Sequence, residues 1–132
     1  LQILEQIRRY MLQTLLPSAR RVTIHVGGED VIVSADCASS VALVVNELVH
    51  NALKYAFPSG QAGRIGIELH SGRPLCQLTV WDNGVGFQAD RPRPGGAGLE
   101  LASTIVREKL TGEWSVESGP GGTRISFDFL EQ

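Results

Sequence analysis

Apolar residues at the start of the chain recur at helical spacing. They stand three or four positions apart up to Pro17, as Leu4, Ile7, Met11 and Leu15. One buried stripe of this kind is typical of an amphipathic helix, and proline cannot continue a helix. The pattern therefore predicts a helix over residues 1–16.

Alternation of apolar and polar residues predicts strands in much of the remaining chain. Residues 21–26 alternate, residues 27–30 form a turn, and residues 31–33 are predicted to pair with 21–26 as a hairpin. Further strands are predicted over residues 64–69 and 75–81. A last hairpin is predicted from residues 114–117 and 123–129, around the glycine-rich turn that separates them.

Two more helices follow from the spacing of apolar residues. The first runs to about Phe57, before Pro58, and its N-cap is predicted among Asp36, Ser39 and Ser40. The second covers residues 99–110. Residues 83–98 are rich in glycine and proline and show no period, so they are predicted to be a long loop, a kind that is usually functional.

Together these elements predict an α+β fold in a single domain over residues 1–132. We expect a two-layer sandwich in which a mixed, mostly antiparallel sheet of about five strands carries three helices on one face. The composition, 42% hydrophobic and 20% charged, is ordinary for a soluble domain. The net charge of −2 offers no general attraction for nucleic acid or for a membrane surface, so neither partner is expected. Cys37 and Cys76 match no metal-ligand spacing, which favours a reducing, cytoplasmic setting.

The predicted helix up to Phe57 carries a polar stripe beside its apolar arc. Glu47, Asn51 and Lys54 lie at positions i, i+4 and i+7, so they share one side of the helix. A carboxylate, an amide oxygen and an ammonium together could hold a hydrated Mg²⁺ and a phosphate chain. A solvated surface face is the plainer interpretation of the same stripe.

An acidic residue and two glycines follow the strand over residues 75–81. Asp82 is followed by Gly84 and Gly86, which let the backbone turn sharply and approach a ligand closely. A carboxylate at a strand end can accept a hydrogen bond from an exocyclic amine such as that of adenine. A simple hairpin turn is the alternative, but no strand is predicted after Phe87.

Glycines also lead directly into the third predicted helix, at Gly95-Gly96-Ala97-Gly98-Leu99. Free amides at a helix N-terminus can bind phosphate, although a flexible hinge would have the same composition. The turn Gly119-Pro120-Gly121-Gly122-Thr123 by itself predicts only a turn with a nearby hydroxyl. The chain has no phosphate-binding loop of the Gly-x-x-x-x-Gly-Lys-Ser/Thr type.

The order of these four motifs resembles one ATPase superfamily, that of gyrase, heat-shock chaperones, mismatch-repair proteins and histidine kinases. The motifs are Asn-Glu-Leu-x-x-Asn-Ala-x-Lys-Tyr, Asp-x-Gly-x-Gly-Phe, Gly-x-Gly-Leu and Gly-Gly-Thr-Arg, and they span nearly the whole chain. Within the superfamily the chain is most similar to sensor histidine kinases. The resemblance implies a Bergerat-type fold with ATP held between the helices and a lid over residues 88–98.

The resemblance also implies roles for single residues. Asn51 matches the Mg²⁺ ligand, Lys54 a phosphate contact, and Tyr55 the aromatic residue beside the adenine. Asp82 matches the residue that binds the adenine amine, with Gly84 and Gly86 beside it. The remaining matches are Gly96, Gly98 and Leu99 in the lid motif and Thr123 near the adenine. Glu47 stands where relatives keep a catalytic base or a group near the transferred phosphate.

Two departures from the family pattern qualify these matches. The loop over residues 87–98 lacks the paired phenylalanines that precede the lid in many membrane histidine kinases, so their lid behaviour does not carry over. Leu110-Thr111-Gly112 stands where relatives often have two glycines, and this is expected to change only a turn.

The function implied is transfer of the γ-phosphoryl group of Mg-ATP to a histidine on a separate dimerisation segment. Residues 1–16 would lead from that segment, because the chain begins inside an apolar-periodic stretch. A response regulator would then receive the phosphoryl group, within a homodimeric parent that is soluble or membrane-anchored. The alternatives are a serine kinase of the anti-sigma-factor type and a degenerate nucleotide-binding module.

Overall fold

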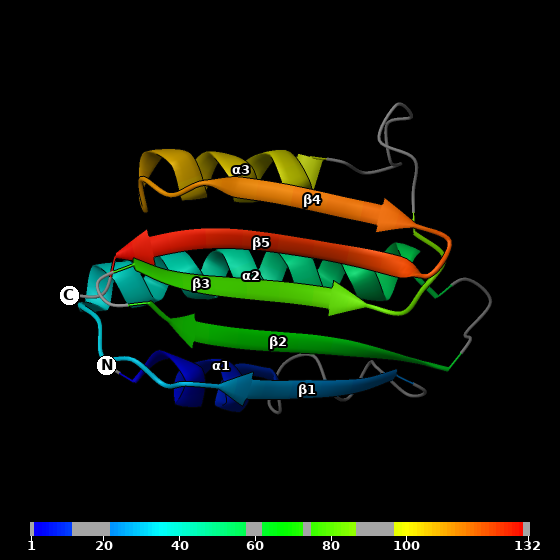
Figure 1. The fold of residues 1–132 in the computed structure, drawn as a ribbon, viewed down its shortest axis with the longest axis horizontal. Coiled ribbons are helices and arrows are strands. Elements are labelled where there is room, and N and C mark those ends of the chain that lie inside the picture. The colour runs from blue at the N-terminus through cyan, green and yellow to red at the C-terminus, as the bar shows by residue number, and fades with distance from the viewer. Residues whose placement is uncertain (1, 12–21, 58–61, 73–74, 87–96, 131–132) are drawn as a thin grey trace.

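The structure is a computed structural model that describes residues 2–11, 22–57, 62–72, 75–86 and 97–130. In these residues, three helices form one layer and five strands form the other (Figure 1). In chain order they are α1 (Ile3–Tyr10), β1 (Val22–Gly28), α2 (Ala35–Tyr55), β2 (Gly63–Ser71), β3 (Leu75–Asp82), α3 (Ala97–Glu108), β4 (Trp114–Gly119) and β5 (Gly122–Leu130).

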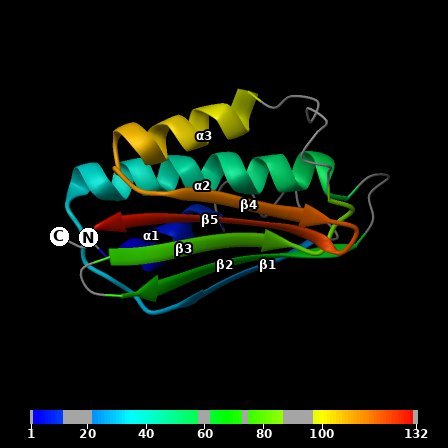
Figure 2. The ribbon, with the colours of Figure 1, turned by 45° about the horizontal axis from the view of Figure 1, so that its top comes forward.

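The strands form one mixed sheet in the order β1-β2-β3-β5-β4. Only β1 and β2 run parallel, and every other neighbouring pair is antiparallel. All three helices lie on one face of this sheet, with α2 in the middle, α1 on the side of β1 and α3 on the side of β4 (Figure 2). The predicted α+β sandwich is confirmed.

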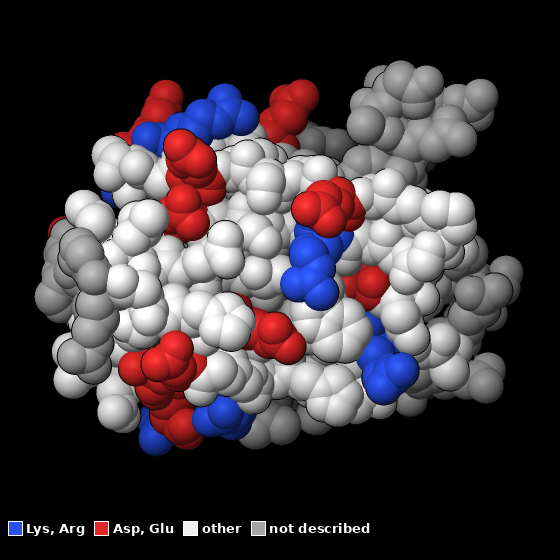
Figure 3. All heavy atoms as spheres, in the orientation of Figure 1, with Lys and Arg blue, Asp and Glu red and all other residues white. Residues whose placement is uncertain are grey.

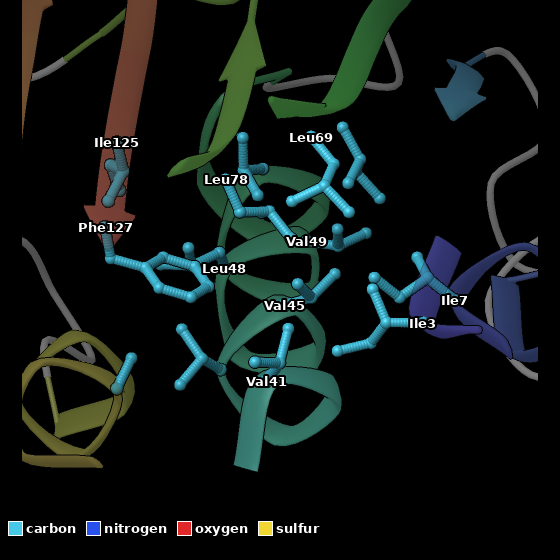
Figure 4. Packing of buried hydrophobic residues seen from close by; sticks show 14 of the residues in the cluster. Ile3, Ile7, Val41, Val45, Leu48, Val49, Leu69, Leu78, Ile125 and Phe127 are labelled. Atoms are coloured by element: carbon cyan, nitrogen blue, oxygen red, sulfur yellow. The ribbon is translucent and has the colours of Figure 1, made fainter. Parts of the chain in front are cut away.

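The 21-residue helix α2 forms the centre of the core. Its buried stripe lies between α1 and the inner face of the sheet, where the side chains interdigitate (Figure 4). The labelled contributors from α2 are Val41, Val45, Leu48 and Val49, and those facing them are Ile3, Ile7, Leu69, Leu78, Ile125 and Phe127. Truncating one of these leucines to alanine would cost about 2–5 kcal/mol, through lost burial and the cavity left behind.

The start of α2 differs from the sequence prediction. Ser34 is the N-cap residue, and its Oγ accepts a hydrogen bond from the Cys37 amide at 3.2 Å. Asp36 therefore lies inside the first turn of the helix, and Ser39 and Ser40 lie beyond that turn. Ser34 is not among the three predicted caps, although serine is a favoured N-cap residue.

The hairpin predicted from residues 21–26 and 31–33 is wrong. The strand β1 pairs in parallel with β2, and Ile32 makes only an isolated bridge with Gln2. Asp30 Oδ1 accepts from the Leu4 amide at 3.0 Å and the Val31 amide at 2.9 Å, which attaches this segment to the start of α1. The alternation over residues 31–33 is real, because Val31 and Val33 are buried, but α1 is the partner.

The other face of the sheet faces the viewer in Figure 1, and none of the described helices covers it. Acidic and basic side chains are interspersed on it, without a continuous basic patch among the described residues (Figure 3). Trp81 covers Gly66 on this face, where any Cβ would overlap the indole ring. No helix among the described segments is long and apolar enough to cross a bilayer.

Candidate functional site

Most of the predicted site residues that the structure describes lie at one end of the sandwich. The C-termini of α2 and β3, the turn between β4 and β5, and the N-terminus of α3 all lie at the right-hand end in Figure 1. At the ends of helices and strands, some backbone N–H and C=O groups have no hydrogen-bond partner within the element. This end therefore combines several motifs that are far apart in the sequence.

Asp82 is the last residue of β3 and is only 8% exposed. Its Oδ1 accepts hydrogen bonds from the Gly84 amide at 2.9 Å and from the Thr123 amide at 3.3 Å. Bonds from amides to a carboxylate are worth roughly 1.5–3 kcal/mol each, so they hold the side chain in one orientation. Asp82 and Thr123 are also direct partners in the β3–β5 ladder, and both side chains point to the helical face.

Glycines surround this carboxylate because neighbouring backbone leaves no room for a Cβ. A Cβ on Gly84 would overlap Ala56 at the end of α2, where the Val85 amide donates to the Ala56 carbonyl at 2.9 Å. Gly86 has a φ of 70°, and a side chain there would meet the Gly119 carbonyl. The segment after Asp82 is thus enclosed between α2 and the β4–β5 turn.

Gly122 completes this enclosure from the other side. Its φ is 130°, and a Cβ would overlap the Asp82 carbonyl oxygen. Thr123 follows, 5% exposed, and its Oγ1 lies 2.8 Å from Ser118 Oγ across the β4–β5 pair. A carboxylate and a fixed hydroxyl are therefore presented side by side at the ends of β3 and β5.

The polar stripe of α2 is only partly buried. Asn51 is 6% exposed, and its Nδ2 has no hydrogen-bond partner among the described residues. Glu47, one turn earlier, is half-buried and forms no ion pair with another described residue. Lys54 is exposed, with Nζ 5.6 Å from the centroid of the half-buried Tyr55 ring. A buried amide without a partner costs about 1–3 kcal/mol, which marks Asn51 as a candidate for an external partner.

Asn46 is a second case on the same helix, since its Oδ1 is also buried without a partner. Five residues separate it from Asn51, which places it about 140° around the helix. It is therefore directed away from the Asn51 stripe. Nothing in the structure explains it.

The glycine-rich lid motif is described only where it enters α3. Residues 88–96 of the lid predicted over residues 88–98, Gly96 among them, lie outside the described residues, and Gly98 is the second residue of α3. Leu99 is half-buried and packs against the hydrophobic core. The structure therefore supports a packing role for Leu99, and its predicted place near a nucleotide stays a prediction.

A hollow of about 440 Å³ opens at this end of the sheet, within the usual range of ligand pockets. Its lining combines Asp82, Thr123 and Ser118 with the outer-face residues Trp81, Asn83, Glu117 and Arg124 and with the turn residues Gly119, Gly121 and Gly122. The hollow thus extends around the sheet edge. We place the recognition chemistry on the helical face, because the buried polar side chains Asp82 and Thr123 point there.

No group of three or more acidic, histidine or cysteine side chains in the described ranges could hold a metal ion by itself. Mg²⁺ does not require such a group, because it keeps several waters and shares its ligands with phosphates. One protein amide oxygen suffices in that arrangement. The unpartnered atom of the buried Asn51 amide is the donor Nδ2, which cannot bind a metal, so the assignment of its oxygen to Mg²⁺ rests on the sequence resemblance.

Two contributors to the site were missed in the sequence. The Ala56 carbonyl accepts a hydrogen bond from the Val85 amide, and Ala56 contacts Gly84. The Ser118 hydroxyl forms a hydrogen bond with the Thr123 hydroxyl. The Ser118 pair had a signal: a two-residue turn at Pro120 and Gly121 places residues 118 and 123 opposite each other. The contact of Ala56 had none, because nothing local links it to residue 85.

Comparison with known proteins matches this geometry. The family model of the histidine kinase-like ATPase domain matches residues 11–129. The chain is 31% identical over 112 residues to blue-light-activated histidine kinase 2 of Erythrobacter litoralis, covering 81% of this chain and 32% of that protein. It is 36% identical over 116 residues to the swarming motility regulation sensor protein RssA of Serratia marcescens, covering 76% of this chain and 24% of that protein.

Solved structures show the same fold. The histidine kinase domain of an Erythrobacter litoralis blue-light-activated kinase superposes with a TM-score of 0.85 at 22% identity, covering 99% of this chain and 62% of that one. The histidine kinase ThkA, solved in complex with the response regulator protein TrrA, gives a TM-score of 0.75 at 17% identity, covering 98% of this chain and 40% of that one.

These matches agree with the motifs and with the fold, and they cover most of the chain. The chain spans about a third or less of the length of the two curated relatives. It belongs to the family of histidine kinase-like ATPase domains found in sensor kinases.

Proposed function

We propose that this domain binds Mg-ATP at the Asp82 end of the sandwich and donates the γ-phosphoryl group to a histidine on a separate dimerisation segment. The observation that carries the proposal is the buried Asp82 carboxylate, oriented by two amides and enclosed by glycines. The two amide donors offset the cost of burying this charge and hold the carboxylate in one orientation at the end of β3. Relatives of this chain are named histidine kinases, which favours the same activity.

The base would bind beside β3 and β5. Adenine presents an exocyclic amine, which donates, next to ring nitrogen N1, which accepts. Asp82 supplies the acceptor for the amine, and the Thr123 hydroxyl beside it supplies a donor. Tyr55, half-buried at the end of α2, would pack against the ring of the base.

The triphosphate would extend along α2 towards the start of α3. The Asn51 amide oxygen would be a Mg²⁺ ligand, Lys54 a phosphate contact, and the amides of the first turn of α3, near Gly98, further donors. When bound, Mg²⁺ would neutralise the charge that develops on the phosphate groups. Glu47, one turn from Asn51, would orient the group that attacks the γ-phosphate.

The acceptor histidine is expected outside this chain. His50 is exposed and follows Glu47 by three residues on the same rigid helix, so it cannot approach the γ-phosphate in line from outside. His25 and His70 are exposed on strands and alternate with partly or fully buried residues. In the transfer, an acceptor nitrogen would form a bond to the γ-phosphorus while the bond to the bridging oxygen breaks and ADP leaves. The phosphoryl group would then pass to a response regulator.

The test has two stages, both with this chain. Calorimetry with a non-hydrolysable ATP analogue, with and without Mg²⁺, measures binding. The chain is then incubated with γ-labelled ATP and Mg²⁺, alone and with an excess of the dimerisation and phosphoacceptor segment of a similar sensor kinase. We expect label on the added segment only, and we expect acid to remove it, because phosphohistidine is acid-labile.

Each other outcome contradicts a definite part of the proposal. Acid-stable label on an added protein would identify a serine kinase. Label on the chain itself, lost in His50→Ala, would place the acceptor inside this domain. Absence of nucleotide binding would leave a degenerate module.

A further inference from the structure

The hydroxyl of Thr123 is held by a second hydroxyl that the family motifs do not include. Ser118 on β4 stands directly opposite Thr123 on β5, and their side-chain oxygens are 2.8 Å apart. Thr123 is almost fully buried, and its amide donates to the same Asp82 oxygen that accepts from Gly84. The backbone of Thr123 is therefore fixed, and the remaining freedom lies in its hydroxyl proton.

A threonine hydroxyl has one proton to donate and two lone pairs that accept. If Thr123 donated its proton to Ser118, its oxygen would present only lone pairs to a base. If Ser118 donates instead, one lone pair of Thr123 is occupied and the Thr123 proton is directed elsewhere. The direction of this one hydrogen bond decides whether Thr123 acts as a donor or as an acceptor in the pocket.

We propose that Ser118 is a positioning residue that donates to Thr123 and thereby makes the Thr123 hydroxyl a donor to N1 of adenine. This inference rests on the proposed function, because it assumes that Asp82 binds the exocyclic amine of the base. The pair would then determine specificity: Asp82 accepts and Thr123 donates, which is the pattern complementary to adenine.

Guanine presents the opposite pattern. Its O6 accepts where adenine has the amine, and its N1 carries a proton where adenine has a lone pair. Bound in the same pose, guanine would place its O6 acceptor against the Asp82 carboxylate, which also accepts. Its N1–H donor would face the Thr123 hydroxyl proton. A pocket with buried polar groups discriminates strongly against a base that leaves them unpaired. Without Ser118 the Thr123 hydroxyl could rotate and accept, so part of this discrimination would be lost.

The chain offers a matched control across the neighbouring strand pair, β3 and β5. Thr79 and Ser126 form another hydroxyl pair, with oxygens 2.9 Å apart, across β3 and β5. Their side chains project from the outer face, because both alternate with residues that are buried against the helices. Ser126→Ala therefore breaks a hydrogen bond of the same kind without reaching the proposed base site.

The experiment measures the affinities of ATP, GTP and 1-deaza-ATP, in which N1 is replaced by CH, for the unmodified chain and its variants. We expect Ser118→Ala to weaken ATP about threefold to tenfold, as for one neutral hydrogen bond, and to leave 1-deaza-ATP unchanged. The ratio of ATP to GTP affinity should fall. Thr123→Val should lower the affinity for ATP by the same factor. The double variant Ser118→Ala/Thr123→Val should show no further loss of affinity. Ser118→Thr, which keeps a hydroxyl, should retain ATP affinity, and Ser126→Ala should behave as the unmodified chain.

Three results would overturn the inference. Equal weakening of ATP and 1-deaza-ATP by Ser118→Ala would show a structural effect on the turn. Unchanged ATP affinity in Ser118→Ala would show that the orientation of the Thr123 proton does not depend on Ser118. Additive losses in the double variant would show independent roles. Failure of the unmodified chain to bind ATP would instead reject the proposed function itself.

Discussion

Two hollows at opposite ends of the sandwich differ in the chemistry of their linings. At the end opposite the proposed site, a cavity of about 630 Å³ is larger than the 440 Å³ hollow near Asp82. Its lining comes from the start of α2, the end of α3 and the end of β5, namely Ser34, Asp36, Cys37, Ser39, Ser40, Lys109, Leu110, Thr111, Phe129 and Leu130. Volume alone would select this far cavity.

Burial of polar groups selects the other end. In the far cavity Asp36, Ser39 and Lys109 are exposed, and the buried lining is Cys37, Leu110 and Phe129. At the proposed site Asp82, Asn51 and Thr123 are buried polar residues. Because burying polar groups costs free energy unless a partner compensates them, buried polar groups indicate a ligand site more reliably than empty volume does.

Asp82→Asn should have the largest effect on binding. The amide keeps the shape of the carboxylate but loses the charge that accepts from the base amine, and it can present a donor in its place. A loss on the order of 1.5–3 kcal/mol in ATP binding is expected, a factor of about 10–150. Calorimetry at constant Mg²⁺ measures it.

The control for this substitution lies in the far cavity. Asp36→Asn makes the same chemical change at an exposed position and should leave ATP affinity unchanged. Equal losses of ATP affinity in the two variants would show that the Asp82 end is not the specific nucleotide site. Unchanged affinity in Asp82→Asn would reject its assignment to the base.

Asn51→Ala should separate metal-dependent binding from nucleotide binding. We expect ATP affinity with Mg²⁺ to fall roughly tenfold, as for loss of one hydrogen bond or ligand contact, and affinity without Mg²⁺ to change little. Thermal stability should not fall, because Nδ2 of Asn51 has no partner in the described residues. Ser40→Ala, about three turns earlier on α2, is the matched control. Equal losses with and without Mg²⁺ would show a structural role.

Thr111→Gly should change stability without changing binding. Thr111 has a φ of 50°, the left-handed region that costs a residue with a Cβ roughly 1–2 kcal/mol. Glycine removes that cost but loses about 0.5–1 kcal/mol of chain entropy, so a net gain of up to about 1 kcal/mol is expected. Denaturant unfolding measures the gain, with Thr111→Ala as the comparison that keeps the Cβ. A change in ATP affinity would link the far end to the site.

Replacing Cys37 should have the smallest effect, a change in the pH dependence of stability that is seen only at alkaline pH. Burial raises the pKa of its thiol above the ordinary value, because desolvation disfavours the thiolate. The folded state therefore binds the proton more tightly than the unfolded state. The resulting stability is fully present below about pH 8.5, the ordinary thiol pKa, and is lost as pH rises through the raised value.

The measurement is the free energy of unfolding from pH 7 to pH 10, for the unmodified chain and for Cys37→Ala. The unmodified chain should lose more stability over this interval than the variant does. Parallel curves would show that the thiol ionises equally in both states.

Much of the architecture could be predicted from the sequence. Six of the eight elements follow from periodicity to within two residues, and α2 only begins earlier than its predicted caps, at Ala35. The order of Asn51, Asp82, the glycines and Thr123 predicted one ATP site, and the structure brings Asp82, Gly84, Gly86 and Thr123 together. The presence of Gly96 near them stays a prediction.

What the sequence alone determined is local: the periodicity of each element and the motifs in which glycine is required by close backbone approach. Only the tertiary structure decided which partners meet across long sequence separations. The parallel pairing of β1 with β2, the contact of Asp30 with α1 and the closure of Ala56 on Gly84 are of this kind. Alternation and capping signals state that a residue needs a partner, but the partner is chosen by how the helices and the sheet pack to bury their apolar faces.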